Sequence, residues 1–339
     1  MKMRYPFISL ALLIALAGAT NASVQKDSLK VLLEKGGSEM KTNKLIEAEA
    51  SFTSALRFDS TNLNALKNLG VIGVMREKYD QSIHFLRRAI AFGVADGDIY
   101  NLLGAAYAGR KELEPSLAAY TQALGRDSTN LDFRRNRAIA LVHAGKFAEA
   151  LPELGKVLAK RPDDGEIIYL MGDCYSGQQD AKNAVASYKL ALDKKYNTVD
   201  FHYHYSIALV ALGDIWSAEE QYGAAVRLAP DNLSVRQEMA VFYVMTSNFK
   251  QAVELFEENL RRDTTFVTSR IGLGAAYAYM GLNDKAQAEL AKVRASNPDK
   301  VNMMKSMMVE GEAYRKNTDS AAAANKTTPP KKTDQGSKP

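Results

Sequence analysis

The chain has 339 residues, of which 46% are apolar and 24% are charged, and its formal net charge at pH 7 is +5. This composition excludes disorder along the whole chain and permits one large fold or two to three domains. Much of the positive charge lies near the ends, at Lys2, at Arg4 and at the four lysines of residues 317–339. Residues 23–316 are therefore nearly neutral, and we expect no nucleic-acid partner, which would need clustered basic charge on the folded surface.

Residues 1–22 have the features of a secretory signal peptide. Two basic residues precede the apolar run FISLALLIALAG, and the small residues ATNAS follow it. This run is too short for a permanent membrane helix, so we expect cleavage after Ala22 or after Ala19 and no stable span afterwards. The mature chain is then exported to a bacterial periplasm or secreted. An uncleaved anchor is the alternative.

Residues 29–300 repeat with a period of 34 residues and without any insertion. The phrase DSTN at residues 59–62, for example, returns at residues 127–130. In every window the eighth and twentieth positions hold glycine, alanine or serine, and the twenty-fourth holds phenylalanine, tyrosine or leucine. We expect two antiparallel helices per window, crossing where both backbones lack bulk. The eight windows are 29–62, 63–96, 97–130, 131–164, 165–198, 199–232, 233–266 and 267–300.

The last window carries a resemblance to a known family. Its sequence SRIGLGAAYAYMGLNDKAQAELAKVRASNPDK resembles a tetratricopeptide repeat, with the signature residues at Leu273, Gly274, Tyr277, Gly281, Ala286, Leu290 and Pro298. The resemblance implies an all-α, right-handed superhelical solenoid of eight helix-turn-helix repeats. Some positions depart from the family pattern: Arg134, Arg236 and Arg270 replace the usual aromatic residue at the fourth position, and Asn259 replaces a small residue at the twenty-seventh.

Two further segments follow the repeats. Residues 301–316 have apolar residues at helical spacing, and we expect one capping helix that covers the end of the array. The methionines of this helix could instead form an adaptable docking surface. Residues 317–339 lack aromatic and branched apolar residues, so a disordered, solvated tail is expected.

The sequence offers little for catalysis. His202 and His204 lie two residues apart on an expected helix, so they point to different faces and cannot bind one metal together. Cys174 is the only cysteine, which excludes an intramolecular disulfide, and we interpret it as a small core residue. We expect no enzyme activity, no cofactor and no metal site. An enzyme with an unrecognised site is kept as a competing hypothesis.

The family resemblance implies a binding surface on the concave face, lined by the first helix of each repeat and occupied by a protein or an extended peptide. Windows one to four carry more basic than acidic residues, and windows five to eight carry the reverse. A ligand is therefore expected to place a carboxylate-bearing end towards Lys67 and Arg135 and a basic end towards Asp173, Asp200 and Glu238. An ordinary solvated face is the alternative. The candidate groove residues are Lys67, Asn68, Asn101, Arg135, Asn136, His143, Tyr169, Asp173, Tyr203, His204, Gln237 and Glu238.

The sequence thus predicts an exported, non-catalytic scaffold that binds a protein or peptide. The alternative is an accessory protein of cell-envelope or outer-membrane assembly that acts through residues 301–339. The identity of the partner, the pathway and the oligomeric state stay open.

Overall fold

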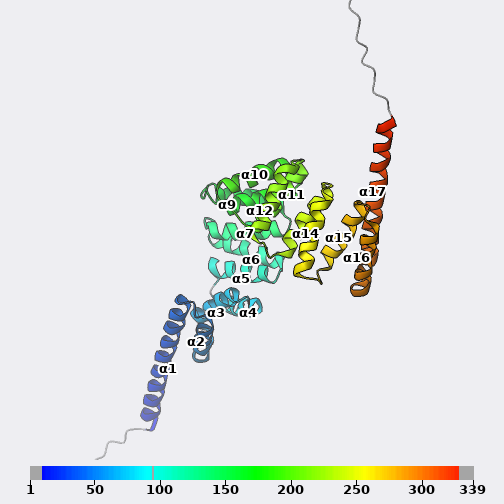
Figure 1. Ribbon diagram of the computed structural model, residues 1–339. Helices are drawn as coiled ribbons and strands as arrows, with labels where there is room; N and C mark the ends of the chain where they lie inside the picture. The colour runs from blue at the N-terminus through cyan, green and yellow to red at the C-terminus, as the bar shows by residue number, and fades with distance from the viewer. Residues whose placement is uncertain (1–9, 94, 328–339) are drawn as a thin grey trace, which may run out of the picture. The chain divides into compact units, whose positions relative to one another are not determined.

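The computed structural model describes residues 10–93 and 95–327, with side chains over 25–93 and 95–320. This part of the chain is all-helical and contains no strand (Figure 1). It divides into two compact units, residues 1–179 and residues 180–339, each of which is described by itself. The helices are α1 (Leu10–Lys41), α2 (Leu45–Phe58), α3 (Leu63–Met75), α4 (Tyr79–Ala91), α5 (Gly97–Gly109), α6 (Leu113–Arg126), α7 (Leu131–His143), α8 (Phe147–Leu158), α9 (Gly165–Gly177), α10 (Ala181–Asp193), α11 (Val199–Leu212), α12 (Ile215–Leu228), α13 (Leu233–Met245), α14 (Phe249–Arg262), α15 (Val267–Tyr279), α16 (Asn283–Ser296), the 3₁₀ turn η1 (Pro298–Lys300) and α17 (Val301–Thr327).

The helix starts follow the 34-residue period. Each odd-numbered helix from α3 to α15 begins at the first residue of a predicted window, and each even-numbered helix from α2 to α16 begins at the seventeenth. The expected all-α, repeated helix-turn-helix fold is therefore confirmed. α1 differs, because it begins at Leu10 and joins part of the predicted signal segment to the first helix of the first window. Residues 1–9 of that segment lie outside the described residues.

The recurring phrase DSTN is a helix stop followed by a helix start. In its first copy, Asp59 Oδ1 accepts hydrogen bonds from the backbone N–H of Thr61 at 3.0 Å and from its hydroxyl at 2.8 Å, which closes the turn after α2. Asn62 then caps α3, since its side-chain oxygen accepts from the backbone N–H of Ala65 at 3.1 Å. The second copy makes the same bonds between Asp127 and Thr129, and Asn130 caps α7.

Small residues stand where the two helices of a repeat cross. In the third repeat, a Cβ atom added to Gly104 would lie 2.7 Å from the ring of Tyr120, the large residue at position twenty-four. Serine fits the twentieth position because its hydroxyl bonds across the crossing. Ser82 Oγ donates to the carbonyl oxygen of Gly70 at 2.7 Å, and Ser116 Oγ donates to that of Gly104 at 2.8 Å.

The three arginines at the fourth position form a recurring contact, in which Arg236 is buried and Arg134 and Arg270 are partly buried. Arg134 donates from Nη2 to the carbonyl oxygen of Ser128 and from Nη1 to Glu153 Oε2, both at 2.6 Å. Arg270 makes the equivalent bonds to the carbonyl oxygen of Thr264 at 2.5 Å and to Glu289 at 2.8 Å. Each guanidinium therefore ties the turn before its own helix to the second helix of the repeat.

Arg236 makes the same contact with a different partner. It donates to the carbonyl oxygen of Pro230 and, at 2.9 Å, to Asn259 Oδ1. Asn259 also donates to the carbonyl oxygen of Leu233 and to Ser269 Oγ, both at 3.0 Å. Arg236 and Asn259, which both depart from the family pattern, are thus hydrogen-bonded to each other.

The last helix is longer than predicted. α17 runs from Val301 to Thr327, whereas the sequence analysis predicts a helix that ends at residue 316. Its extension passes through the four alanines at residues 321–324, which have the highest intrinsic helix propensity. Met304 and Met308 are buried, and Met304 packs over Gly274 of α15, so the helix covers the last repeat as expected. Residues 328–339 of the predicted tail lie outside the described residues.

Over the described part of the chain, none of the helices is long and apolar enough to cross a membrane.

Candidate interaction site

The fifth positions of the first helices carry several predicted groove residues, and in the structure they bond to the next repeat. Lys67 Nζ lies 3.0 Å from Asp98 Oδ2 and 3.4 Å from Asp96 Oδ2. Burial disfavours the charged ammonium, but the hydrogen bond to Asp98 and the attraction of both carboxylates outweigh it, so the pKa of Lys67 is raised. Arg135 forms an ion pair with Glu166 in the same way. Both cations are therefore partly neutralised within the protein, which weakens the expectation that they attract a ligand carboxylate.

Three of the predicted groove residues are asparagines, and their amide side chains do not all meet in the structure. Asn136 Nδ2 donates to Asn101 Oδ1 at 2.9 Å, which joins α5 to α7. Asn68 instead donates to the carbonyl oxygen of Asn64, one turn earlier on its own helix, at 2.9 Å. The structure thus brings two of the three amides together.

A hollow of about 380 Å³ adjoins Asn136 in the first unit. His143 is exposed at its edge, and the remaining lining is mostly apolar. The hollow is large enough for one or two side chains of a bound segment. Its lining residues are Ala108, Lys111, Leu113, Tyr120, Asn136, Ile139, Ala140 and His143.

Predicted groove residues of the second unit also contact one another. Tyr203 OH lies 3.5 Å from Glu238 Oε2, and the ring of His204 packs against that of Tyr203 with centroids 5.7 Å apart. Burial and the nearby Glu238 carboxylate raise the pKa of Tyr203. Gln237 Oε1 accepts a hydrogen bond from Ser269 Oγ at 2.6 Å.

The two remaining candidates lie in the first unit. Tyr169 is only 9% exposed, so it contributes little surface, whereas Asp173 is half-buried.

An apolar groove of about 450 Å³ in the second unit was missed by the sequence reasoning. It lies over α15, with α13 on one side and α17 on the other. Gly272 of α15, at the sixth position of its window, is smaller than the residue at that position in every other repeat, and this was the signal available in the sequence. The lining residues are Gln237, Val241, Val244, Met245, Phe256, Val267, Thr268, Ile271, Gly272, Ala275, Lys300, Met303 and Met307.

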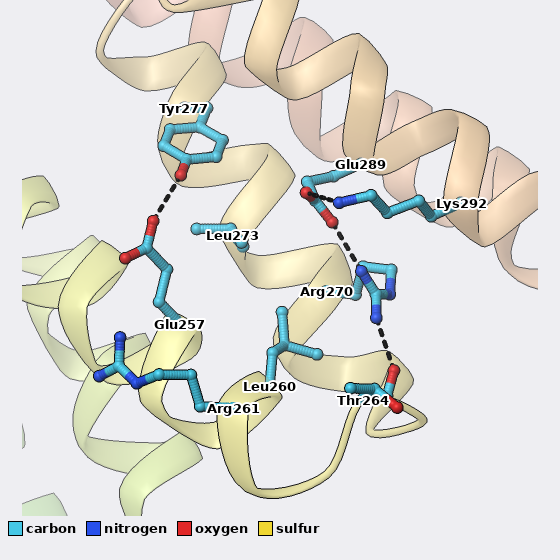
Figure 2. Close-up of a pocket in the computed structure, with 9 residues that line it drawn as sticks. All are labelled: Glu257, Leu260, Arg261, Thr264, Arg270, Leu273, Tyr277, Glu289 and Lys292. Carbon is cyan, nitrogen blue, oxygen red and sulfur yellow. Dashed lines mark hydrogen bonds and ion pairs between the residues drawn. The ribbon is translucent and has the colours of Figure 1, made fainter.

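A third hollow, of about 460 Å³, lies among α14, α15 and α16 and has charged side chains in its lining (Figure 2). Tyr277 OH donates to Glu257 Oε1 at 2.7 Å on one side. On the other side Glu289 accepts from Arg270 at 2.8 Å and from Lys292 at 2.7 Å. The charged groups of each side thus pair within that side, so we assign these bonds a structural role.

Two of the titratable groups singled out by sequence, Cys174 and His202, are buried. Burial, with a smaller effect from the charge of Asp173, raises the pKa of Cys174 to about 12. His202 Nδ1 lies 2.7 Å from Gln221 Oε1 and Nε2 lies 2.7 Å from Asn197 Oδ1, and burial lowers the pKa of this histidine. Among the described residues, no cluster of three or more His, Cys, Asp or Glu side chains is placed to hold a metal ion.

Comparison with known proteins identifies the type of repeat. Residues 111–174 and 141–205 match the family model described as Tetratricopeptide repeat. Mouse BBSome complex member BBS4 is 32% identical over 88 residues, which cover 26% of this chain and 17% of that protein. Chicken DnaJ homolog subfamily C member 3 is 22% identical over 279 residues, which cover 76% of this chain and 52% of that protein. The matched part of this chain thus spans about half or less of each of these curated relatives.

Solved structures share the fold at lower identity. The type IV pilus biogenesis factor PilW is 20% identical with a TM-score of 0.53, covering 60% of this chain and 94% of that one. The C-terminal part of a tetratricopeptide protein from Cytophaga hutchinsonii is 18% identical with a TM-score of 0.53, covering 71% and 99%. Residues 111–205 therefore match the tetratricopeptide repeat, and the described part of the chain shares the repeated helical fold of these solved structures.

Proposed function

We propose that the protein is an exported, non-catalytic scaffold that binds a protein or peptide on the faces of its first helices. The observation that carries this proposal is that each unit has an open, largely apolar hollow on these helices. The hollow beside Asn136 and His143 serves the first unit, and the groove over α15 serves the second. Hollows of a few hundred Å³ with few polar groups are typical of binding sites. The tetratricopeptide-type repeats support the same class of function.

Export rests on the features of residues 1–22. Fractionation of cells that express the full chain tests it, with the N-terminus of the recovered protein read by mass spectrometry. We expect the protein in the periplasmic or secreted fraction, beginning at residue 20 or 23. A chain recovered intact in the cytoplasm would contradict export.

Site-specific photocrosslinking tests binding. A crosslinking residue is placed at His143, at Tyr203 and, as a control on a second helix, at the exposed Lys189. We expect the same partner to be captured at His143 and Tyr203 and not at Lys189. Equal capture at all three positions, or capture at none, would contradict binding on the first-helix faces.

A second candidate is an accessory role in cell-envelope assembly through the C-terminal helix. It is favoured by two apolar side chains of α17 that face solvent, Met303 at 57% and Val309 at 63% exposure. Met304 and Met308 of the same helix are core residues, so deleting all of α17 would damage the last repeat. Removal of residues 317–339 combined with Val309→Glu is the cleaner test. Loss of localisation with unchanged crosslinking at His143 would support this candidate.

A further inference from the structure

We propose that the apolar groove of the second unit binds an amphipathic α-helix of a protein partner, with an acidic residue beside its apolar stripe. This inference deepens the proposed function and rests on it, since it names the kind of partner segment that one of the two hollows accepts.

The shape of the groove suits a helix. Its floor consists of Ile271, Gly272 and Ala275 of α15, all nearly fully buried, and the ring of Phe256 from α14 packs against Gly272. Its walls carry exposed apolar side chains, with Val241 at 38%, Met245 at 68% and Met303 at 57% exposure. Three neighbouring helices thus present a trough whose sides are adjustable, because methionine side chains are unbranched and flexible.

The chemistry of the lining disfavours an extended segment. The backbone of a strand-like peptide carries N–H and C=O groups that must find partners when buried, and leaving them unpaired is costly. The groove offers few partners, because its walls are helices whose backbone groups are already bonded. Gln237 is the amide in the lining, and its oxygen already accepts from Ser269. A helix satisfies its own backbone and needs only apolar contacts, as in other helix-in-groove complexes.

The positive charge of the groove lining favours an acidic residue in the bound helix. Among the residues that line the groove, Lys300 is the charged one, and its side chain is 49% exposed. Its Nζ atom lies 3.5 Å from Asp299 Oδ2, which is a long contact and leaves the ammonium available to a second carboxylate. A glutamate or aspartate beside the apolar stripe of the bound helix would therefore be attracted to this end of the groove.

Two phage-displayed peptide libraries test the proposal. One presents amphipathic helices randomised at the apolar stripe and at one flanking acidic position. The other has the same composition with two central prolines, which keep its members extended. Both are selected against the full-length protein. Enriched peptides are then synthesised with a fluorescent label and titrated by anisotropy against wild type and variants.

Four single variants decide the result. Met245→Glu and Met303→Glu place a charge in the groove at exposed positions, where folding is not at stake. Met75→Glu is the matched control, since Met75 of α3 is 54% exposed and lies outside the groove. We expect binders from the helical library whose affinity falls more than tenfold in both groove variants and is unchanged in Met75→Glu. Lys300→Glu should weaken them severalfold.

Other outcomes would overturn the proposal. These are groove-dependent binders from the proline library alone, helical binders that ignore both groove variants, or no binder from either library. A dimer in sedimentation equilibrium that Met245→Glu dissociates would show that a second copy occupies the groove instead. Capture of a partner at His143 separates this proposal from the proposed function. It would support the scaffold function even if the groove over α15 binds no helix.

Discussion

Arg236 and Asn259 lie 2.9 Å apart, guanidinium nitrogen to amide oxygen, with 3% and 0% of their surfaces exposed. Each residue departs from the family pattern at its own position, and together they form a hydrogen-bond network that also includes the carbonyl oxygens of Pro230 and Leu233 and the hydroxyl of Ser269. A buried polar group costs little free energy while its partners are present and much when one is removed.

We therefore predict that Asn259→Ala lowers the free energy of unfolding by about 2–4 kcal/mol, since it leaves a buried guanidinium short of an acceptor. The double variant Arg236→Met with Asn259→Ala should recover part of this loss, because both partners then become apolar. Urea denaturation followed by circular dichroism measures both. Arg236→Met alone completes the cycle. If the double variant loses as much free energy of unfolding as the two single variants together, the residues are not coupled.

The helix crossing of the third repeat gives a second prediction. Gly104→Val should lower the free energy of unfolding by about 1–3 kcal/mol, because its side chain would meet the ring of Tyr120. Gly125→Ala in α6 is the control, since nothing lies within 4 Å of its added Cβ. We expect that control to stabilise the protein by about 0.5–1 kcal/mol through helix propensity. Thermal unfolding distinguishes the two, and equal effects would contradict close packing at the crossing.

Tyr243 should make stability depend on alkaline pH. Burial, the hydrogen bond from its hydroxyl to Glu219 at 2.8 Å and the nearby negative charges raise its pKa to about 12. In the unfolded chain a tyrosine ionises near pH 10, so the stability this group contributes is complete below about pH 10 and is lost as the pH rises towards 12. The difference between the ultraviolet titration curves of wild type and Tyr243→Phe should correspond to one phenol that ionises near pH 12. A missing phenol that ionises near pH 10 would contradict this contact.

Cys174 should be chemically inert in the folded protein. The thiol is fully buried and its raised pKa leaves almost no thiolate at neutral pH. A thiol-reactive chromogenic disulfide should label it only after urea is added. Rapid labelling of the native protein at pH 7 would contradict its position in the core.

Local sequence rules predicted much of the fold. The 34-residue period placed the two helices of each repeat. Two helices can cross closely only where both carry small residues, so glycine, alanine and serine at fixed positions of the period mark the crossings. The recurring phrase DSTN was visible in the sequence, and in the structure its asparagines, Asn62 and Asn130, cap α3 and α7. The partners of Arg134, Arg236 and Arg270 were not visible, since each guanidinium bonds to groups that only the folded repeat brings near.

The candidate site was predicted less well. Helical position alone placed Tyr169 in the groove, but the structure buries it, and the ion pairs of Lys67 and Arg135 depend on contacts between repeats that spacing does not reveal. The apolar groove over α15 forms only when α13, α15 and α17 pack together, and α17 lies outside the repeats. Gly272 is smaller than its counterparts in the other repeats, but it gave no indication of the residues that form the walls of the groove.

The central claim is that the first-helix faces bind a protein partner, and titration calorimetry with the partner identified by crosslinking tests it most directly. His143→Glu and Met245→Glu alter the hollows of the two units, and Lys189→Glu alters an exposed second-helix position. We predict a loss of affinity of tenfold or more for at least one of the two hollow variants and no change for Lys189→Glu. Unchanged affinity in both hollow variants, or an equal loss in all three, would contradict the claim.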